Sequence, residues 1–280
     1  MAPPPKSHTL PSGDELPALG LGTWNIDGET VKESVRAALD AGYTHIDTAE
    51  GYRNEAEIGE AIADYDRDDV FLTSKVLAKN LDYDSLIESC EASLERLGTD
   101  YLDLYLVHWP NPAISLRETL DAMATLHEAG LVRNVGVSNF SAYQLSCAHH
   151  ISGVPIAVNQ IEFHPWFQRP DLVEYCRGTD TVVEAAAPLA RTEVFEDEVV
   201  RDLAEKYEVS PAQVVVKWAI ERDIVVLPKS SSPEHVRANA DLEFAMDESD
   251  LVALDERDRD RPVYDHPARD WSSDVYGINQ

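Results

Sequence analysis

Short runs of apolar and β-branched residues alternate with longer amphipathic segments along most of this chain. A short apolar run predicts a strand that is buried on both faces, as in a parallel sheet. We therefore expect strands at Ala18–Thr23, Thr44–Asp47, Val70–Ser74, Leu102–Val107, Val132–Val137, Ile156–Asn159, Thr181–Ala185 and Ile224–Leu227.

The amphipathic segments predict helices, because their apolar residues recur with the helical period. Asp82 is placed as the N-cap of one helix, and Ser210-Pro211 is typical of the start of another. The clearest helical segments are Val31–Ala41, Glu55–Tyr65, Tyr83–Leu97, Leu116–Ala129, Ser141–His149 and Glu198–Tyr207. Strands and helices that alternate every ~30 residues predict an α/β fold, a single (β/α)8 TIM barrel that spans residues 1–280.

Three segments depart from this alternation. Near the N-terminus, the residues on either side of Ser12-Gly13 predict a small hairpin over the barrel floor. An irregular excursion is expected between Pro188 and Glu196. After Asp247 we expect an extra acidic helix, and then a tail from Pro262 to Gln280 that bears Tyr264, Trp271 and Tyr276. This tail could cover one barrel mouth, or it could equally be a loosely packed end. The mixed-charge run from Asp255 to Arg261 is interpreted as a solvated face.

Composition limits the class of protein. No apolar run approaches the roughly 20 residues that a membrane span needs, and the proline-rich N-terminus lacks the apolar region of a secretory signal. The three cysteines form no C-x-x-C pair, which favours a reducing compartment. We therefore expect a cytoplasmic protein, without a membrane partner and monomeric.

The net charge of −29 is the most unusual bulk property, with 52 acidic and 23 basic residues. A nucleic-acid partner is disfavoured, because phosphate binding needs a basic surface. Disorder is disfavoured by the 44% of apolar residues and by the periodic segments. The charge favours adaptation to molar salt, where screening acts over about 3 Å; the alternative is an ordinary acidic protein.

Polar residues follow several of the expected strands, at the barrel end where active sites occur. Strand 2 ends in Asp47 with Tyr52 five residues later, strand 3 is followed by Lys75, and strand 4 by His108. Further polar or aromatic positions after strands are Thr23-Trp24, Trp109, Ser138-Asn139, Gln160 and Lys229-Ser230.

The quartet of Asp47, Tyr52, Lys75 and His108 suggests carbonyl chemistry. A lysine ammonium beside a tyrosine is expected to lower the pKa of the phenol, while the carboxylate orients the lysine. Such a phenol can give a proton to a carbonyl oxygen as that oxygen becomes negative, and the imidazole can donate a second hydrogen bond. None of the four groups is a hydride source, so a redox cofactor is expected.

Other interpretations of these residues remain open. Taken singly, a buried tyrosine, lysine–aspartate pair or histidine is more often structural than catalytic. His45, Asp47 and His108 could form the metal site of a barrel hydrolase, although the lysine would repel a cation and no H-E-x-x-H spacing is present. A third possibility is a subunit that binds nucleotide without catalysis. We expect no metal.

At these residues the chain resembles the aldo-keto reductase family, from Gly20 to Asn239. The most specific stretch is Gly42–Ala49, which continues through Tyr52 and Asn54-Glu55 to Ile58-Gly59. Further similar motifs are Gly20–Trp24, Thr73–Lys75, Leu106–Pro110, Gly136–Phe140, Asn159-Gln160 and Leu227–Ser230. Each motif is weak alone, but their order and spacing are specific.

The resemblance implies a tetrad of Asp47, Tyr52, Lys75 and His108, and an NADP(H) cofactor bound without a G-x-G-x-x-G loop. By the family pattern, Ser138, Asn139 and Gln160 would hold the nicotinamide carboxamide, and Lys229 and Ser230 would meet the 2′-phosphate. The full set implied for the cofactor is Thr23, Trp24, Asp47, Ser138, Asn139, Gln160, Leu189, Lys229, Ser230, His235 and Asn239. The substrate, a small aldehyde, ketone or sugar-derived dicarbonyl, would contact Trp24, Tyr52, His108 and Trp109.

Two positions depart from the family pattern. Ala186 stands where the family usually has an aromatic residue that stacks on the nicotinamide, so packing there would be looser or another ring would substitute. His235 stands where an arginine is expected beside the 2′-phosphate, and imidazole holds a phosphate less firmly than guanidinium. Use of NAD(H) as well as NADP(H) is therefore expected to be possible.

Overall fold

The strands pair in parallel around a barrel in the computed structural model, which describes residues 7–264. Their order is β10-β9-β8-β7-β6-β5-β4-β3, and bridges from Leu19 to Val226 and from Gly22 to Lys229 join its two edges. The barrel strands are β3 (Gly20–Gly22), β4 (His45–Asp47), β5 (Phe71–Val76), β6 (Leu102–Val107), β7 (Val132–Ser138), β8 (Ile156–Glu162), β9 (Val182–Ala186) and β10 (Val225–Val226). The prediction of a (β/α)8 barrel is confirmed.

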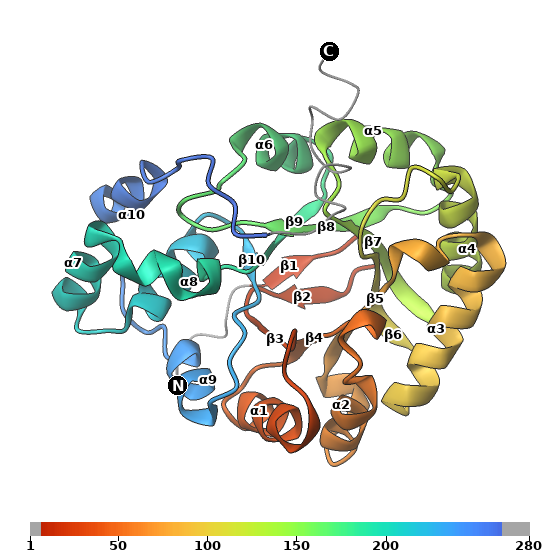
Figure 1. Cartoon of the computed structure of the whole chain (residues 1–280), viewed down its shortest axis with the longest axis horizontal. Helices are drawn as coiled ribbons and strands as arrows, with labels where there is room; N and C mark the ends of the chain where they lie inside the picture. Colours follow the sequence, from red (N-terminus) through yellow and green to blue (C-terminus); the bar gives the residue numbers. More distant parts are fainter. Residues whose placement is uncertain (1–6, 265–280) are drawn as a thin grey trace.

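Helices surround the barrel as an outer ring (Figure 1). They are α1 (Gly28–Asp40), α2 (Glu55–Ile62), α3 (Tyr83–Leu97), α4 (Leu116–Glu128), α5 (Ala142–Ile151), α6 (Pro170–Gly178), α7 (Glu198–Tyr207), α8 (Pro211–Glu221), α9 (Pro233–Ala240) and α10 (Glu248–Asp255). The predicted caps are present, since Asp82 accepts from the Ser85 amide and Ser210 forms a capping box with Gln213. The sequence did not predict α6, which begins at Pro170.

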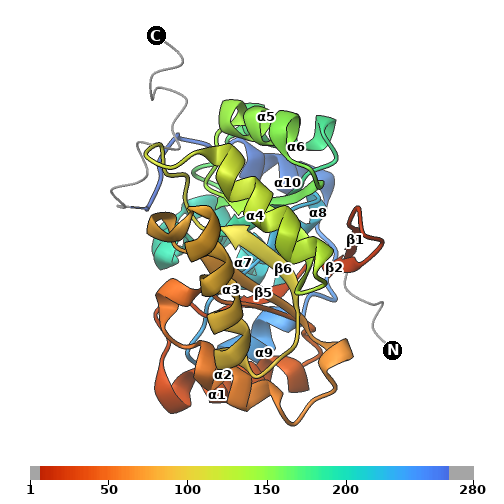
Figure 2. The same ribbon diagram turned by 90° about the vertical axis from the view of Figure 1, so that its right-hand side faces the viewer.

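A hairpin of β1 (Ser7–Thr9) and β2 (Glu15–Pro17) closes the barrel floor, as predicted. Leu10 and Leu16 are buried against side chains of the barrel interior, including Leu104 and Val225. Figure 2 shows the hairpin on one side of the molecule and the segment after α10 reaching toward the opposite side. The open mouth is therefore at the ends of the strands that carry the predicted polar residues.

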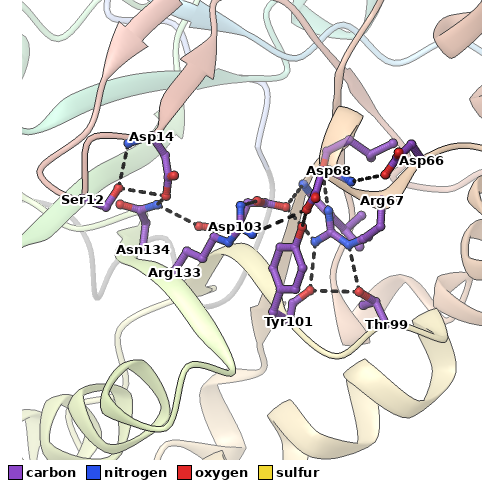
Figure 3. Close-up of polar contacts among 12 residues, drawn as sticks. Ser12, Asp14, Asp66, Arg67, Asp68, Thr99, Tyr101, Asp103, Arg133 and Asn134 are labelled. Atoms are coloured by element: carbon purple, nitrogen blue, oxygen red, sulfur yellow. Dashed lines mark hydrogen bonds and ion pairs between the residues drawn. The ribbon is translucent and has the colours of Figure 1, made fainter.

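A polar network lies beside the hairpin on the floor (Figure 3). The buried Asp103 carboxylate accepts from the guanidinium of Arg67 at 2.7 Å and from the amide of Leu72 at 2.9 Å, and Arg133 lies 3.4 Å away. The Tyr101 ring lies between the two guanidinium groups, 4.0 and 3.9 Å from its centroid. Each oxygen of this buried carboxylate thus has a cation or amide partner, which offsets the cost of its burial.

In the described part of the chain, no helix combines the length and the apolar character that crossing a bilayer requires.

Candidate active site

The four residues of the predicted tetrad meet at the mouth of the barrel. Asp47 is the last residue of β4, and Tyr52 ends a short 3-10 turn, η1 (Glu50–Tyr52). Lys75 lies inside β5 rather than after it, because the strand continues to Val76, and His108 directly follows β6. Strands β4, β5 and β6 are neighbours, so the fold brings together side chains that are far apart in the sequence.

Lys75 is the centre of this group and is fully buried. Its ammonium donates to Asp47 Oδ1 at 2.7 Å and to the Thr48 carbonyl at 2.8 Å. The hydroxyl oxygen of Tyr52 lies 3.4 Å from the same nitrogen. The Tyr52 and His108 rings meet edge to face with centroids 5.5 Å apart. One cation is thus fixed between a carboxylate and a phenol, beside an imidazole.

The prediction of a lowered pKa at Tyr52 is wrong in its net direction. Burial raises the pKa of Tyr52 well above its ordinary value of 10.0, and the nearby Asp47 carboxylate raises it further. The physical reason is that burial removes water from the phenolate, and this cost outweighs the stabilisation that the Lys75 ammonium can give. The phenol therefore keeps its proton at neutral pH.

Three polar side chains follow on the next strands around the mouth. Ser138 ends β7 and donates to the Gln160 carbonyl at 2.8 Å, and Asn139 donates to the His108 carbonyl at 3.0 Å. Asn139 has a φ of 63°, a left-handed conformation in which asparagine is one of the favoured residues. Gln160 lies inside β8, not after it, and donates to Asp47 Oδ2 at 2.9 Å. The predicted polar positions therefore adjoin the tetrad directly.

A cavity of about 760 Å³ opens at this mouth and extends from the tetrad to α9. Its wall includes most of the predicted site residues, namely Trp24, Asp47, Tyr52, His108, Trp109, Ser138, Asn139, Gln160, Leu189, Lys229, Ser230 and His235. Two predicted cofactor residues, Thr23 and Asn239, are buried but do not line it. The Thr23 hydroxyl instead donates to the Asp47 carbonyl at 2.8 Å.

The cavity wall carries two cations, Arg191 and Lys229, although the sequence as a whole is strongly acidic. Neither has an ion-pair partner among the described residues, and the Arg191 guanidinium lies 5.4 Å from the Trp24 ring centroid. Arg191 and Thr192 both have positive φ values, 51° and 74°. Strained backbone of this kind clusters at functional sites. The wall is therefore suited to an anionic ligand.

Sequence reasoning missed two residues of this site, Arg191 and Glu184. Arg191 lies in the irregular excursion after β9, where the pattern gave no signal for its direction. Glu184 lies inside β9, and its carboxyl group accepts a hydrogen bond from the side-chain amide of Gln160 at 3.0 Å. An acidic residue within an otherwise apolar strand was the signal that could have identified Glu184. Tyr264 was predicted only in general terms, as part of a tail that could cover one barrel mouth.

Residues 257–264 form a C-terminal strap that reaches the cavity. The amides of Val263 and Tyr264 donate to the Glu162 carboxylate, and the Tyr264 ring lies 6.2 Å from the Trp109 ring. Tyr264 lines the cavity, as the tail prediction allowed; Trp271 and Tyr276 lie outside the described residues. Ala186 also lines the wall and presents no ring there.

The metal interpretation finds no support in the arrangement of the described side chains. His45 Nε2 is 3.0 Å from the Thr73 hydroxyl, inside the barrel, and no group of three histidine, cysteine or carboxylate side chains within residues 7–264 is arranged to hold an ion.

Comparisons with known proteins identify the family of this chain. The model of the aldo/keto reductase family matches residues 18–259. An aldo-keto reductase of Mycolicibacterium smegmatis is 40% identical over 88% of this chain and 91% of its own, and a glyoxal reductase of Bacillus subtilis is 37% identical over 92% and 95%. The crystal structure of a Bombyx mori aldo-keto reductase in complex with NADP superposes with a TM-score of 0.87, at 30% identity over 94% of this chain and 96% of that one.

Proposed function

Because this chain belongs to the aldo/keto reductase family and is therefore an NADP-dependent oxidoreductase, we propose that it reduces small aldehydes, ketones or sugar-derived dicarbonyls to alcohols. The observation that carries the proposal is the position of the Tyr52 hydroxyl, 3.4 Å from the Lys75 ammonium at the wall of the cavity. A phenol that keeps its proton, beside a fixed cation, is suited to give that proton to a developing alkoxide.

The described residues fit an extended anionic dinucleotide. Lys229 and Ser230 would hold the 2′-phosphate near the start of α9, and Ser138, Asn139 and Gln160 would hold the carboxamide at the other end. Arg191, which has no carboxylate partner, would face the charged middle of the ligand. When bound, the reduced nicotinamide supplies the hydride.

The tetrad would manage the proton. Tyr52 gives its hydroxyl proton to the carbonyl oxygen as the carbonyl carbon accepts the hydride, and the resulting phenolate is stabilised by the Lys75 ammonium. Asp47 keeps that ammonium charged and oriented through its 2.7 Å contact. His108, whose ring packs against Tyr52, would donate a second hydrogen bond to the substrate oxygen. Water returns a proton to Tyr52 after the product leaves.

For the cofactor, we propose that NADPH is preferred and NADH is also used. His235 is exposed at the cavity rim, and its imidazole would add less to 2′-phosphate binding than an arginine would. The preference then rests mainly on Lys229. For the substrate, the walls formed by Trp24, Trp109 and Tyr264 would contact a small organic group next to the carbonyl.

We further propose that the protein is a cytoplasmic monomer. The described large apolar side chains with high exposure are Trp24, Tyr143 and Val252, and they belong to a cavity mouth and two separate helices rather than to one patch. All three cysteines are free, as in a reducing compartment. Sedimentation at the mass of a dimer would contradict the monomer.

The first experiment replaces Tyr52 with Phe and screens simple aldehydes, ketones and dicarbonyls in molar salt, with NADPH and NADH side by side. We expect Y52F to lose carbonyl reduction by about 100-fold or more, with the Kd for NADPH within a few-fold of the wild type, because only the proton donor is removed. Retained turnover in Y52F would contradict the assignment. A wild-type protein that binds NADPH but reduces none of the carbonyls would instead indicate a nucleotide-binding subunit, and chelator-sensitive hydrolysis would indicate a metal enzyme.

A further inference from the structure

A second buried carboxylate, which the proposed reaction does not use, lies inside the barrel next to the tetrad. Glu184 of β9 is fully buried, and its Oε2 accepts from the side-chain amide of Gln160 at 3.0 Å. The same nitrogen of Gln160 donates to Asp47 Oδ2 at 2.9 Å. One amide nitrogen is thus shared between a tetrad carboxylate and Glu184.

This sharing fixes which way the Gln160 amide points. The ionised Asp47 carboxylate only accepts hydrogen bonds, so it selects the nitrogen of Gln160 rather than its oxygen, and the Glu184 Oε2 atom accepts from the same nitrogen. Gln160 also lines the cavity. Its carbonyl oxygen is therefore the atom left for a ligand, and it can accept from an amide donor. With one acidic neighbour alone, the amide would be held by a single contact.

We propose that Glu184 is a positioning residue that fixes the amide of Gln160, so that the Gln160 carbonyl oxygen accepts a hydrogen bond from the carboxamide of the bound nicotinamide. This inference rests on the proposed function, because it takes Gln160 as part of the cofactor site. Glu184 itself does not line the cavity and acts only through Gln160.

A purely structural role explains the surroundings of Glu184 poorly. Its second oxygen, Oε1, has no hydrogen-bond partner among the described residues, and the nearest ring nitrogen, on His45, is 3.8 Å away. That nitrogen is instead 3.0 Å from the Thr73 hydroxyl. Asp103 on the floor, by contrast, is compensated by two arginines and an amide (Figure 3). A buried carboxylate without such compensation costs stability, which is typical of a functional group.

The ionisation of Glu184 predicts a pH dependence of cofactor binding that a role in packing alone would not produce. Burial and the Asp47 charge raise the pKa of Glu184 to about 8, and the Gln160 hydrogen bond and the Lys75 charge lower it only in part. The other titratable neighbour, His45, is neutral, because its burial and the Lys75 charge lower its pKa to about 3. Above about pH 8 a second negative charge therefore forms beside Asp47. That charge favours the oxidised nicotinamide, which is cationic, over the neutral reduced ring.

The test measures NADPH dissociation constants in molar salt for the wild type, Glu184→Leu, Glu184→Gln and the control Asp103→Asn. We expect E184L to raise the Kd about ten-fold at pH 7, because Gln160 loses one of the contacts that orient it. E184Q retains an acceptor oxygen and should bind within about two-fold of the wild type. D103N should lower the melting temperature and leave the Kd unchanged, since it removes a buried carboxylate from the floor.

A second measurement follows the ratio of the NADP⁺ and NADPH dissociation constants from about pH 6.5 to about pH 9.5. In the wild type, NADP⁺ should gain several-fold over NADPH through a step near pH 8, and E184Q should lack this step. Any of three results would overturn the proposal. The first is a folded E184L that binds NADPH with wild-type affinity, the second is a wild-type NADP⁺/NADPH ratio without the step near pH 8, and the third is an E184Q that retains this step. If E184L does not fold, the pH measurement decides alone. A wild-type protein that binds neither nucleotide would end the proposed function as well.

Discussion

His45 shows how a single residue can depend on a partner far away in the sequence. Its ring fills a notch in the barrel beside Gly20, where an added Cβ would lie 2.6 Å from its Nδ1 atom. The ring also meets Phe71 edge to face, with centroids 5.1 Å apart. Burial, together with the positive charge of Lys75, lowers the pKa of His45 to about 3. The folded protein therefore holds this imidazole neutral over most of the acidic range.

This pKa predicts a loss of stability in acid. Below about pH 6.5, His45 is protonated in the unfolded chain but stays neutral in the folded protein. The free energy of unfolding therefore falls as the pH drops toward 3, by up to about 1.4 kcal/mol per pH unit. In His45→Gln this contribution is absent. Urea unfolding at constant molar salt should show the wild type losing more stability than H45Q between pH 6 and pH 4. Parallel pH dependence in the two proteins would contradict the assignment.

At the scale of elements, the C-terminal strap is where sequence and structure differ most. The run from Asp255 to Arg261 was expected to be a solvated face, and Arg259 and Arg261 are indeed exposed, but Arg257 and Arg259 also form ion pairs that the sequence did not indicate. Arg257 and Arg259 lie 3.1 and 2.6 Å from the buried Asp197 carboxylate, which also accepts from the Trp166 ring nitrogen at 2.8 Å. The guanidinium of Arg259 lies 5.0 Å from the Trp166 ring centroid. Alternate arginines thus attach the strap to the barrel rim and direct Tyr264 to the cavity.

Asp197→Ala should release the strap, because it removes the acceptor of two arginines and one indole. We expect a loss of about 2 kcal/mol in the free energy of unfolding, because charged hydrogen bonds are lost but the two arginines, which are 31% and 41% exposed, can be solvated by water. We also expect faster proteolysis within residues 257–264 and a higher KM for carbonyl substrates, while NADPH binding should change less. Substrate kinetics and timed trypsin digestion measure these effects.

Glu196→Gln is the matched control, since its pair with Arg201 spans 3.7 Å and both side chains are exposed. We expect a change within about 0.5 kcal/mol. Equal trypsin resistance and equal KM values in D197A and the wild type would show that the strap does not depend on Asp197.

The sequence predicted the strands and most helices because each has a local signal. The helices α3 and α7 have the predicted bounds, since apolar periodicity and an aspartate cap mark them. The tetrad could also be predicted, because each member lies at or near the end of a strand. Arg191 and the strap could not, because irregular backbone has no period from which the direction of a side chain could be inferred.

At the scale of the whole molecule, the net charge of −29 remains without internal balance. Ion pairs use many of the lysines and arginines in the described residues, for example Lys206 with Asp247 and Asp250, at 2.9 and 2.5 Å. With 52 acidic and 23 basic side chains, however, the acidic charges exceed the basic ones by 29, so this excess cannot be neutralised within the protein. Their mutual repulsion opposes the compact state unless salt screens it.

We therefore predict that the folded protein needs high salt. Raising KCl from low concentration to about 2 M should raise the melting temperature by about 10 °C or more, since the screening length falls to about 3 Å or less. Sucrose at matched osmolality should not reproduce the gain, because it does not screen charge. Equal melting temperatures at both KCl concentrations would refute adaptation to salt.

The sequence by itself determined the barrel, the positions of the four predicted tetrad residues and the excess of acidic residues, because local patterns or composition indicate each of them. Only the tertiary structure decided which charges meet. It buried Tyr52 beside Asp47, so that the pKa of the phenol is raised, and it placed Glu184 against Gln160. Such pairings depend on strand register and on burial. Their electrostatic energies depend on the distance between the charges and on the local dielectric, and the linear sequence pattern specifies none of these quantities.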